Sequence, residues 1–212
     1  MPEGQIFNVM IAFFEEDDWS FQWMEGLPVL SMGFTGRSGK WMCYAQAREQ
    51  QEQFVFYSVC PLNAPRERMT AIAEFVTRAN YGMIIGNFEV DYADGEIRYK
   101  TSIDVEGDRL TSPLVKQMVY ANVLIMDRYL PGLMSVIYGN ASPIEEIDKI
   151  ETGLPMSFGE DDELLDGLLE IDDFYDEDDF DDDFDDEDDF DDDDLGDDSD
   201  FGILPPGNAN LN

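Results

Sequence analysis

Histidine is absent from this sequence of 212 residues, and cysteine occurs only twice, as Cys43 and Cys60. Without an imidazole the chain cannot build a Ser–His–Asp or Cys–His catalytic site, and it lacks the commonest zinc ligand. Two cysteines are too few for a structural zinc site. Carboxylate pairs could act as acid and base, but they need a cleft that shifts their pKa values. The sequence therefore favours a non-enzymatic protein with no catalytic residue, cofactor or metal site. A carboxylate-based enzyme is the least favoured alternative.

Basic residues are absent after Lys149. All 12 lie between Arg37 and Lys149, whereas the 49 acidic residues divide into 22 up to Phe158 and 27 after it. The net charge of −37 is therefore 12 − 22 = −10 up to Phe158 and −27 beyond it. A chain of this charge repels nucleic acid and acidic membranes, so the expected electrostatic partners are basic proteins.

Long hydrophobic runs are also missing. No uncharged apolar stretch approaches the roughly 18 residues that a transmembrane helix needs. The N-terminal residues lack the basic region of a secretory signal. We therefore expect a cytoplasmic protein without a membrane partner, in which both cysteines stay reduced.

The composition changes near Phe158 and divides the chain into two parts. Residues 1–158 have the composition of a folded domain, whereas residues 159–212 are rich in aspartate and low in complexity. Repulsion between carboxylates, together with too little apolar area, predicts that this tail is disordered. Near its start, residues 163–171 (ELLDGLLEI) would group four leucines on one or two helical turns. The tail would serve solubility or capture basic proteins. Its candidate anchors are Phe174, Phe180, Phe184 and Phe190.

Apolar periodicity and turn residues predict a regular order of elements in the first part. The expected fold class is α+β, with helices packed on one face of an antiparallel sheet. A three-stranded meander and a hairpin build that sheet, in the order α-β-β-β-α-β-β-α. A short helix from Ser142 closes the domain. The helices are expected at residues 6–14, 63–82 and 112–131, the meander strands at 30–35, 40–49 and 53–60, and the hairpin at 86–105.

The stretch GRSGK at residues 36–40 invites comparison with a phosphate-binding loop. The first glycine of that motif would fall on Phe34, and Trp41 replaces the hydroxyl residue that should follow the lysine. We therefore interpret the stretch as the first turn of the meander.

A two-residue turn at Gln51 and Glu52 would pair residues whose numbers sum to 103, which places Cys43 opposite Cys60. The plainer interpretation is two buried thiols that pack as small apolar side chains. The alternative is a reversible cross-strand disulfide, which needs Cα atoms within roughly 7 Å of each other. In that case the protein would be a redox- or ligand-responsive regulator.

In the hairpin at 86–105, Asp94-Gly95 is a strong signal for a two-residue turn. Paired numbers would then sum to 189, which makes one face apolar and the other a ladder of opposite charges. The expected apolar pairs are Phe88–Thr101, Val90–Tyr99 and Tyr92–Ile97, and the expected charged pairs are Glu89–Lys100 and Asp91–Arg98.

The long helix that starts at Ser112 and Pro113 is apolar on every side in its middle. Consecutive residues lie about 100° apart around a helix, so one sheet cannot cover four adjacent apolar residues. A second apolar surface is needed, which predicts an interface with a client protein or a second copy of the chain. Pro131 should kink or restart the helix, because it has no N–H. The predicted interface residues are Met118, Val119, Val123, Leu124, Ile125 and Met126.

Three separated blocks of sequence resemble the YbjN-domain family of bacterial sensory transduction regulators, and most of all its variant in photosynthetic bacteria. They are WMCYAQAREQQEQFVFYSVCP at residues 41–61, RANYGMIIGNFEVDYADGEIRYKTSIDVEGDRL at 78–110 and VYANVLIMDRYLPGLMSVIYGNASP at 119–143. The resemblance covers about residues 40–151, and residues 1–39 fit it only loosely.

The resemblance implies a fold similar to that of type III secretion chaperones, and the order of elements predicted above agrees with it. Such chaperones are small, acidic, usually dimeric and non-enzymatic, and they hold extended segments of client proteins. The family has no catalytic motif to carry over. We therefore expect a chaperone-like or adaptor protein that binds a protein client or forms a homodimer, with a tail that reaches basic proteins.

Overall fold

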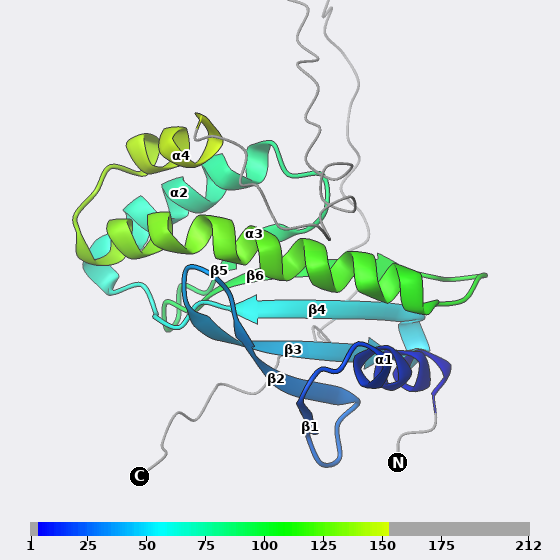
Figure 1. Cartoon of the computed structure of the whole chain (residues 1–212). Coiled ribbons are helices and arrows are strands. Elements are labelled where there is room, and N and C mark those ends of the chain that lie inside the picture. The colour runs from blue at the N-terminus through cyan, green and yellow to red at the C-terminus, as the bar shows by residue number, and fades with distance from the viewer. Residues whose placement is uncertain (1–3, 153–212) are drawn as a thin grey trace, which may run out of the picture. The chain divides into compact units, whose positions relative to one another are not determined.

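The computed structural model describes residues 4–152. In this part of the chain, six strands form one antiparallel sheet in the order β1-β2-β3-β4-β6-β5, accompanied by four α-helices (Figure 1). The α+β class is as predicted, and the structure adds the short edge strand β1. The helices are α1 (Gln5–Glu16), α2 (Met69–Tyr81), α3 (Ser112–Tyr138) and α4 (Pro143–Thr152). The strands are β1 (Phe21–Trp23), β2 (Val29–Thr35), β3 (Lys40–Arg48), β4 (Gln53–Val59), β5 (Asn87–Val90) and β6 (Ile97–Asp104).

The turn at residues 36–39 joins β2 to β3, as predicted. The carboxylate of Asp127 in α3 accepts hydrogen bonds from the backbone N–H groups of Arg37 (3.0 Å) and Ser38 (2.7 Å). Successive N–H groups of this kind are what a phosphate-binding loop offers to an anion. Here the chain's own carboxylate takes them, so the turn is a structural joint between the sheet and α3.

The predicted register of the β3–β4 hairpin is wrong by two residues. Paired numbers sum to 101 instead of 103, so Cys43 lies opposite Ser58 and not opposite Cys60. The connection is a 3-10 turn at Glu49–Gln51 followed by Glu52 in the left-handed conformation, with φ of 52°. This connection of four residues replaces the predicted turn of two.

A tertiary contact accounts for the longer β3–β4 connection. The Glu49 carboxylate accepts hydrogen bonds from the backbone N–H groups of Phe7 (2.7 Å) and Ile6 (3.3 Å) in the first turn of α1. These N–H groups have no acceptor within the helix, and the helix dipole favours a negative charge beside them. Glu49 therefore caps a helix more than forty positions away in the chain.

The predicted register of the β5–β6 hairpin is also wrong by two residues, since paired numbers sum to 187 instead of 189. Asp91 and Tyr92 belong to the connection and do not pair with Arg98 and Ile97. Tyr92 is 67% exposed, whereas the prediction placed it on the apolar face. A shift of two residues keeps each paired side chain on its predicted face. The observed pairs are Asn87–Lys100, Phe88–Tyr99, Glu89–Arg98 and Val90–Ile97.

The tip of this hairpin packs against the loop that precedes α2. Gly95 has φ of 82°, and its carbonyl accepts a hydrogen bond of 2.7 Å from the N–H of Ala64. A Cβ on Gly95 would lie 2.1 Å from the Ala64 carbonyl oxygen. Glycine is therefore required there for a close backbone approach as well as for its positive φ.

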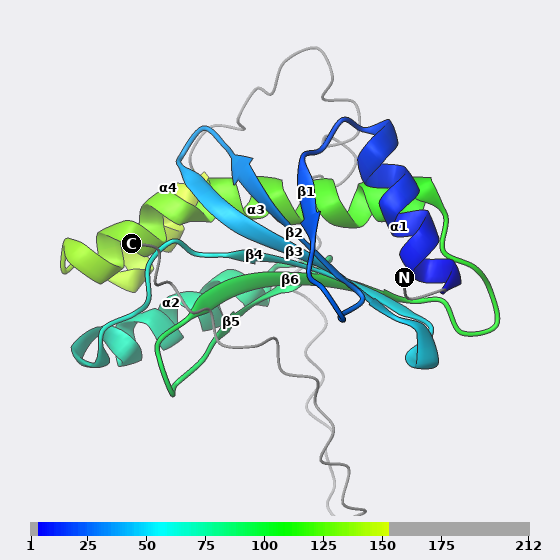
Figure 2. The ribbon, with the colours of Figure 1, turned by 90° about the horizontal axis from the view of Figure 1, so that it is seen from below.

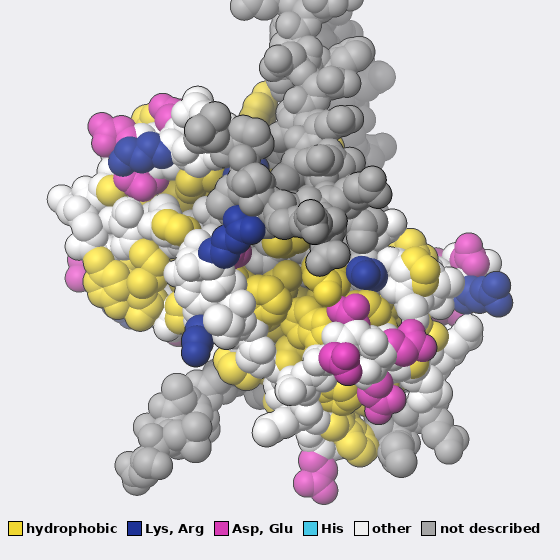
Figure 3. Space-filling model, viewed as in Figure 1, with side chains coloured by type: hydrophobic (Ala, Val, Ile, Leu, Met, Phe, Trp, Pro, Cys, Tyr) yellow, Lys and Arg dark blue, Asp and Glu magenta, His cyan; other side chains and the backbone are white. Residues whose placement is uncertain are grey.

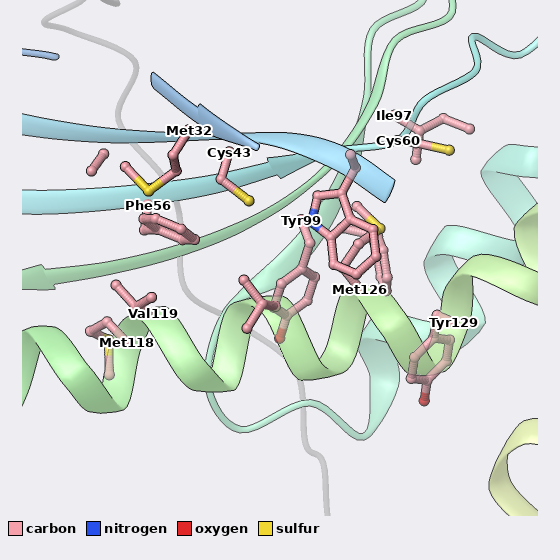
Figure 4. Packing of buried hydrophobic residues seen from close by; sticks show 14 of the residues in the cluster. Met32, Cys43, Phe56, Cys60, Ile97, Tyr99, Met118, Val119, Met126 and Tyr129 are labelled. Carbon is pink, nitrogen blue, oxygen red and sulfur yellow. The ribbon is translucent and has the colours of Figure 1, made fainter. Parts of the chain in front are cut away.

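Helices α1, α2 and α3 pack on the same face of the sheet, and α3 runs along it (Figures 1 and 2). Phe14 of α1 stacks on Phe56 of β4 with ring centroids 6.1 Å apart. Tyr129 of α3 contacts Phe88 of β5 at 5.5 Å and Phe75 of α2 at 6.3 Å. Figure 4 shows Phe56, Tyr99 and Met126 in the layer between α3 and the strands.

Helix α3 is continuous through Pro131, so the predicted restart does not occur. Pro131 is exposed, and the next residue, Gly132, is buried. A Cβ on Gly132 would lie 2.7 Å from the Ile150 side chain and 3.1 Å from the Phe75 ring. The glycine lets α2 and α4 approach α3 closely, and their contacts hold the segment beyond the proline.

Candidate protein-binding surfaces

An open groove between α2 and α4 has a volume of about 650 Å³, and we call it the α2–α4 groove. The buried residues of α2 face the core, and the groove residues occupy the opposite side of that helix. Its lining is Ala73, Glu74, Thr77, Arg78 and Tyr81 from α2, with Ile147, Asp148 and Glu151 from α4.

Large hydrophobic side chains are exposed at the C-terminal end of α2. Tyr81, which lines the groove, is 84% exposed, and Ile84 in the following loop is 81% exposed. Single exposed hydrophobic residues are common on protein surfaces, but an apolar groove with exposed aromatic residues at its edge is typical of an interaction site.

The rim of the α2–α4 groove is acidic. Arg78 is paired with Glu74 at 3.0 Å, while Asp148 and Glu151 add two further carboxylates. Partial burial raises the pKa of Glu151, an effect that Arg128 opposes and the negative charge of Asp148 reinforces. The groove therefore suits a ligand that carries positive charge.

The predicted interface residues of α3 divide into two groups. Val119, Val123 and Met126 are fully buried, and Met118 is only 8% exposed, so these four belong to the core. The fold itself covers these four residues, so the structure does not place them on a surface for a partner, contrary to the prediction. The sheet together with α1, α2 and α4 supplies the covering surface that the prediction assigned to a partner.

The other two predicted interface residues, Leu124 and Ile125, are half-buried. Figure 3 shows hydrophobic side chains gathered over α3 on the viewed face, with both basic and acidic side chains beside them. Part of the predicted apolar surface of α3 is therefore present, although it is smaller than the sequence suggested.

Cys43 and Cys60 are both free and buried. Figure 4 shows Cys60 beside Ile97, apart from Cys43. Burial raises the pKa of Cys43 to about 12, although a hydrogen bond with Ser58 opposes this, and burial raises the pKa of Cys60 to about 11. Thiols with such pKa values are poor nucleophiles at neutral pH, and the cross-strand pairing that motivated a redox switch is not present.

Sequence analysis missed a polar contact that joins α3 to the sheet. The side-chain N–H₂ group of Asn122 donates to the backbone carbonyls of Phe56 and Tyr99, each at 3.1 Å, and the Thr101 hydroxyl donates to the Met118 carbonyl at 2.9 Å. The sequence did carry a signal, because Asn122 is the one amide within the apolar stretch MVYANVLIM at residues 118–126. Most buried polar groups are hydrogen-bonded, as the N–H₂ group of Asn122 is, whereas its Oδ1 has no hydrogen-bond partner among the described residues.

Residues 4–152, the part of the chain that the structure describes, contain no group of three or more acidic or cysteine side chains placed to hold a metal ion. None of their helices is long and apolar enough to span a bilayer. The candidate tail anchors Phe174, Phe180, Phe184 and Phe190 lie outside the described residues.

Comparison with protein families gives a match over residues 8–134, to the YbjN model described as "Putative bacterial sensory transduction regulator". This match covers more than half of the chain. The chain belongs to the YbjN family. The predicted membership is confirmed, and the match extends into the first 39 residues, which the sequence resemblance fitted only loosely.

Two solved structures are similar to this YbjN-family chain. The crystal structure of YbjN, "a putative transcription regulator from E. coli", has a TM-score of 0.48 at 9% identity and covers 61% of this chain and 89% of that chain. The HopA1–SchA chaperone–effector complex has a TM-score of 0.39 at 12% identity and covers 58% of this chain and 92% of that chain. At these values the likeness supports no inference about function. No curated protein matches the chain.

The family description is regulatory and names no reaction. A regulatory role is therefore the coarse functional class that the family description gives for this chain. Its finer assignment depends on the surfaces described above.

Proposed function

We propose that this YbjN-family chain is a non-enzymatic protein-binding module that holds a client segment in the α2–α4 groove. The observation that carries the proposal is the groove itself, in which exposed Tyr81 borders an apolar floor formed by Ala73 and Ile147. Burial of apolar area of this kind supplies the main favourable free energy of most protein association.

The acidic rim selects the chemistry of the client. Asp148 and Glu151 lie beside the apolar floor, and the one basic residue of the lining, Arg78, is paired with Glu74. A segment with apolar side chains flanked by lysine or arginine would therefore be favoured, and an acidic segment would be repelled. The negative charge of residues 159–212 would add long-range attraction for the same basic partners.

The test uses the full chain and a short labelled peptide of alternating leucine and lysine. Thr77 is exposed in the lining, so Thr77→Arg would fill the groove and add a positive charge. The control is Ser102→Arg, which adds the same charge at an exposed site in β6.

We expect Thr77→Arg to weaken peptide binding, measured by fluorescence anisotropy, by about tenfold or more. Ser102→Arg should leave it nearly unchanged. If both variants bind equally well, the groove is not the binding site. If a leucine–glutamate peptide binds as tightly as the leucine–lysine peptide, the acidic rim does not select the client.

A further inference from the structure

The outward side of α3 forms a narrow surface that the sheet does not cover. The residues on this side recur at helical spacing and lie opposite Asn122 and Met126, which face the sheet. We call them the outer stripe of α3. They are Gln117, Tyr120, Leu124, Arg128 and Pro131, and Ile125 borders the stripe beside Leu124.

Basic side chains border the outer stripe, although the domain as a whole is acidic. The Lys116 ammonium lies 5.5 Å from the centre of the Tyr120 ring. Arg128 lies one turn after Leu124, and the exposed Arg37 is in the turn that Asp127 holds against α3. Asp127 is itself buried and hydrogen-bonded to that turn, while Asp17 accepts the Tyr120 hydroxyl. The stripe therefore offers apolar side chains with three basic residues beside them, Arg37, Lys116 and Arg128, and with the Asp17 carboxylate at Tyr120.

The chain leaves the described region beside this stripe. The Arg128 side chain donates to the carbonyl of Ile150 at 2.9 Å, and α4 ends at Thr152. Residues 153–162 separate this point from Glu163. Ten residues can span up to about 35 Å, whereas the stripe from Arg128 back to Lys116 is only about 18 Å long. The segment that starts at Glu163 can therefore reach any part of the stripe.

The composition of residues 163–170 (ELLDGLLE) complements the stripe. In a helical conformation its leucines share one face, because they recur at positions i and i+4. The same segment carries Glu163, Asp166 and Glu170, which match the basic border of the stripe and would be repelled by the acidic rim of the α2–α4 groove. The leucines are Leu164, Leu165, Leu168 and Leu169.

We propose that residues 163–170 of the chain itself pack on the outer stripe of α3, with their leucines against Leu124 and Ile125 and their carboxylates facing Arg37, Lys116 and Arg128. This intramolecular contact shields the remaining apolar surface of α3. It leaves the α2–α4 groove to clients, and it does not depend on whether that groove binds them.

The test is thiol cross-linking in the full chain. Cys43 and Cys60 are buried with raised pKa values, so introduced cysteines react selectively. The test variant combines Leu124→Cys with Leu165→Cys. In one control the cysteine on α3 is moved to an exposed site in β6, by combining Ser102→Cys with Leu165→Cys. In the other the cysteine in the segment is moved further along the chain, by combining Leu124→Cys with Leu195→Cys.

We expect an intramolecular disulfide in the test variant that forms about tenfold faster than in either control, because docking raises the local concentration of the two thiols. Circular dichroism of each variant establishes that it is folded. Equal rates in the test variant and the controls would overturn the proposal. A cross-link between two molecules would show that a second copy covers α3, and this outcome would also overturn it.

Charge reversal supplies a second measurement that leaves the leucines intact. Lys116→Glu should slow the cross-link between positions 124 and 165, and Arg66→Glu, at an exposed site before α2, should not. High salt should slow the cross-link as well, since it screens the attraction between the segment and the stripe. A rate that is insensitive to both changes would contradict the charged part of the contact.

Discussion

The two faces of the sheet carry different kinds of side chain. The face beneath α1, α2 and α3 holds buried aromatic residues such as Phe56 and Tyr99, and Asn122 bonds to the carbonyls of both. On the opposite face the Glu89 carboxylate pairs with Arg98 at 2.8 Å and also with Lys100. Apolar burial dominates the first face, whereas the second combines these ion pairs with the buried side chains of Val55 and Tyr57.

This difference indicates which face carries the stability of the domain. Burial of large side chains contributes roughly 1.5–3 kcal/mol for each one, whereas a partly exposed ion pair contributes about 0.2–1 kcal/mol. Substitutions on the covered face should therefore destabilise the fold strongly, and substitutions on the open face weakly. Four measurements sharpen or break this comparison.

The largest effect is expected for Met126→Ala on the sheet-facing side of α3. Met126 is fully buried, so its truncation leaves a cavity and should lower the free energy of unfolding by about 2–5 kcal/mol. Chemical denaturation measures this loss. The matched control is Leu124→Ala on the outer stripe of the same helix, where a loss of about 1 kcal/mol is expected. Equal losses would mean that both sides of α3 are packed alike.

The two sides of α3 also show what the sequence could and could not predict. Four adjacent apolar residues correctly indicated that α3 needs cover beyond one sheet. The pattern could not show that α4 and α2 supply much of this cover, because that depends on the close approach at Gly132. A fully buried residue of this helix and a half-buried one have the same apolar signature, so the sequence alone cannot separate Val119 from Leu124.

The hairpin registers carry a related lesson. Alternation along a strand predicted the correct face for the paired residues of β5 and β6, since a shift of two preserves alternation. The lengths of the connections were not predictable, because contacts distant in sequence set them. The Glu49 carboxylate, in the β3–β4 connection, caps α1, and Gly95 packs on Ala64. Local turn signals contain no information on either contact.

The second prediction concerns the polar contact under α3. Asn122→Ala should lower the free energy of unfolding by about 1–3 kcal/mol, since buried groups lose hydrogen bonds that water cannot replace. Gln117→Ala, at an exposed site of the same helix, should change it by less than about 0.5 kcal/mol. Urea unfolding of both variants gives the comparison. An unchanged free energy of unfolding for Asn122→Ala would show that the hydrogen bonds of Asn122 do not stabilise the covered face.

The third prediction uses pH to probe the thiols on the covered side. The folded-state pKa values of Cys43 and Cys60 are raised to about 12 and about 11 from an ordinary value of 9.0, so above pH 9 the unfolded chain releases these protons first. The protonated thiols therefore stabilise the fold fully below pH 9. This stabilisation is lost as the pH rises from 9 through the folded-state pKa values of the two thiols. At about pH 10 the loss should be on the order of 1 kcal/mol for each thiol.

The measurement is urea unfolding at pH 8 and pH 10, for the native chain and for the double variant Cys43→Ala, Cys60→Ala. The difference between the two proteins isolates the contribution of the thiols, because both proteins have the same tyrosines. The double variant should lose less stability between the two pH values. Rapid reaction of either thiol with a disulfide reagent at pH 8, without denaturant, would contradict the burial and would restore the case for a redox role.

The smallest effect is expected on the open face, for Glu89→Gln. Burial alone would raise the pKa of Glu89, but hydrogen bonds from Lys100 and Arg98 outweigh it and lower the pKa below 4.5. A lowered pKa stabilises the fold above pH 4.5 and ceases to do so as the pH falls through the folded value. Glu89→Gln should therefore lower the free energy of unfolding by about 0.2–1 kcal/mol at pH 7, and this difference should vanish toward low pH and shrink in high salt.

Glu106→Gln, at an exposed position just after β6, should cause no measurable loss at either pH. A loss for Glu89→Gln as large as that for Met126→Ala would mean that the ion pairs stabilise the sheet as much as its apolar face does.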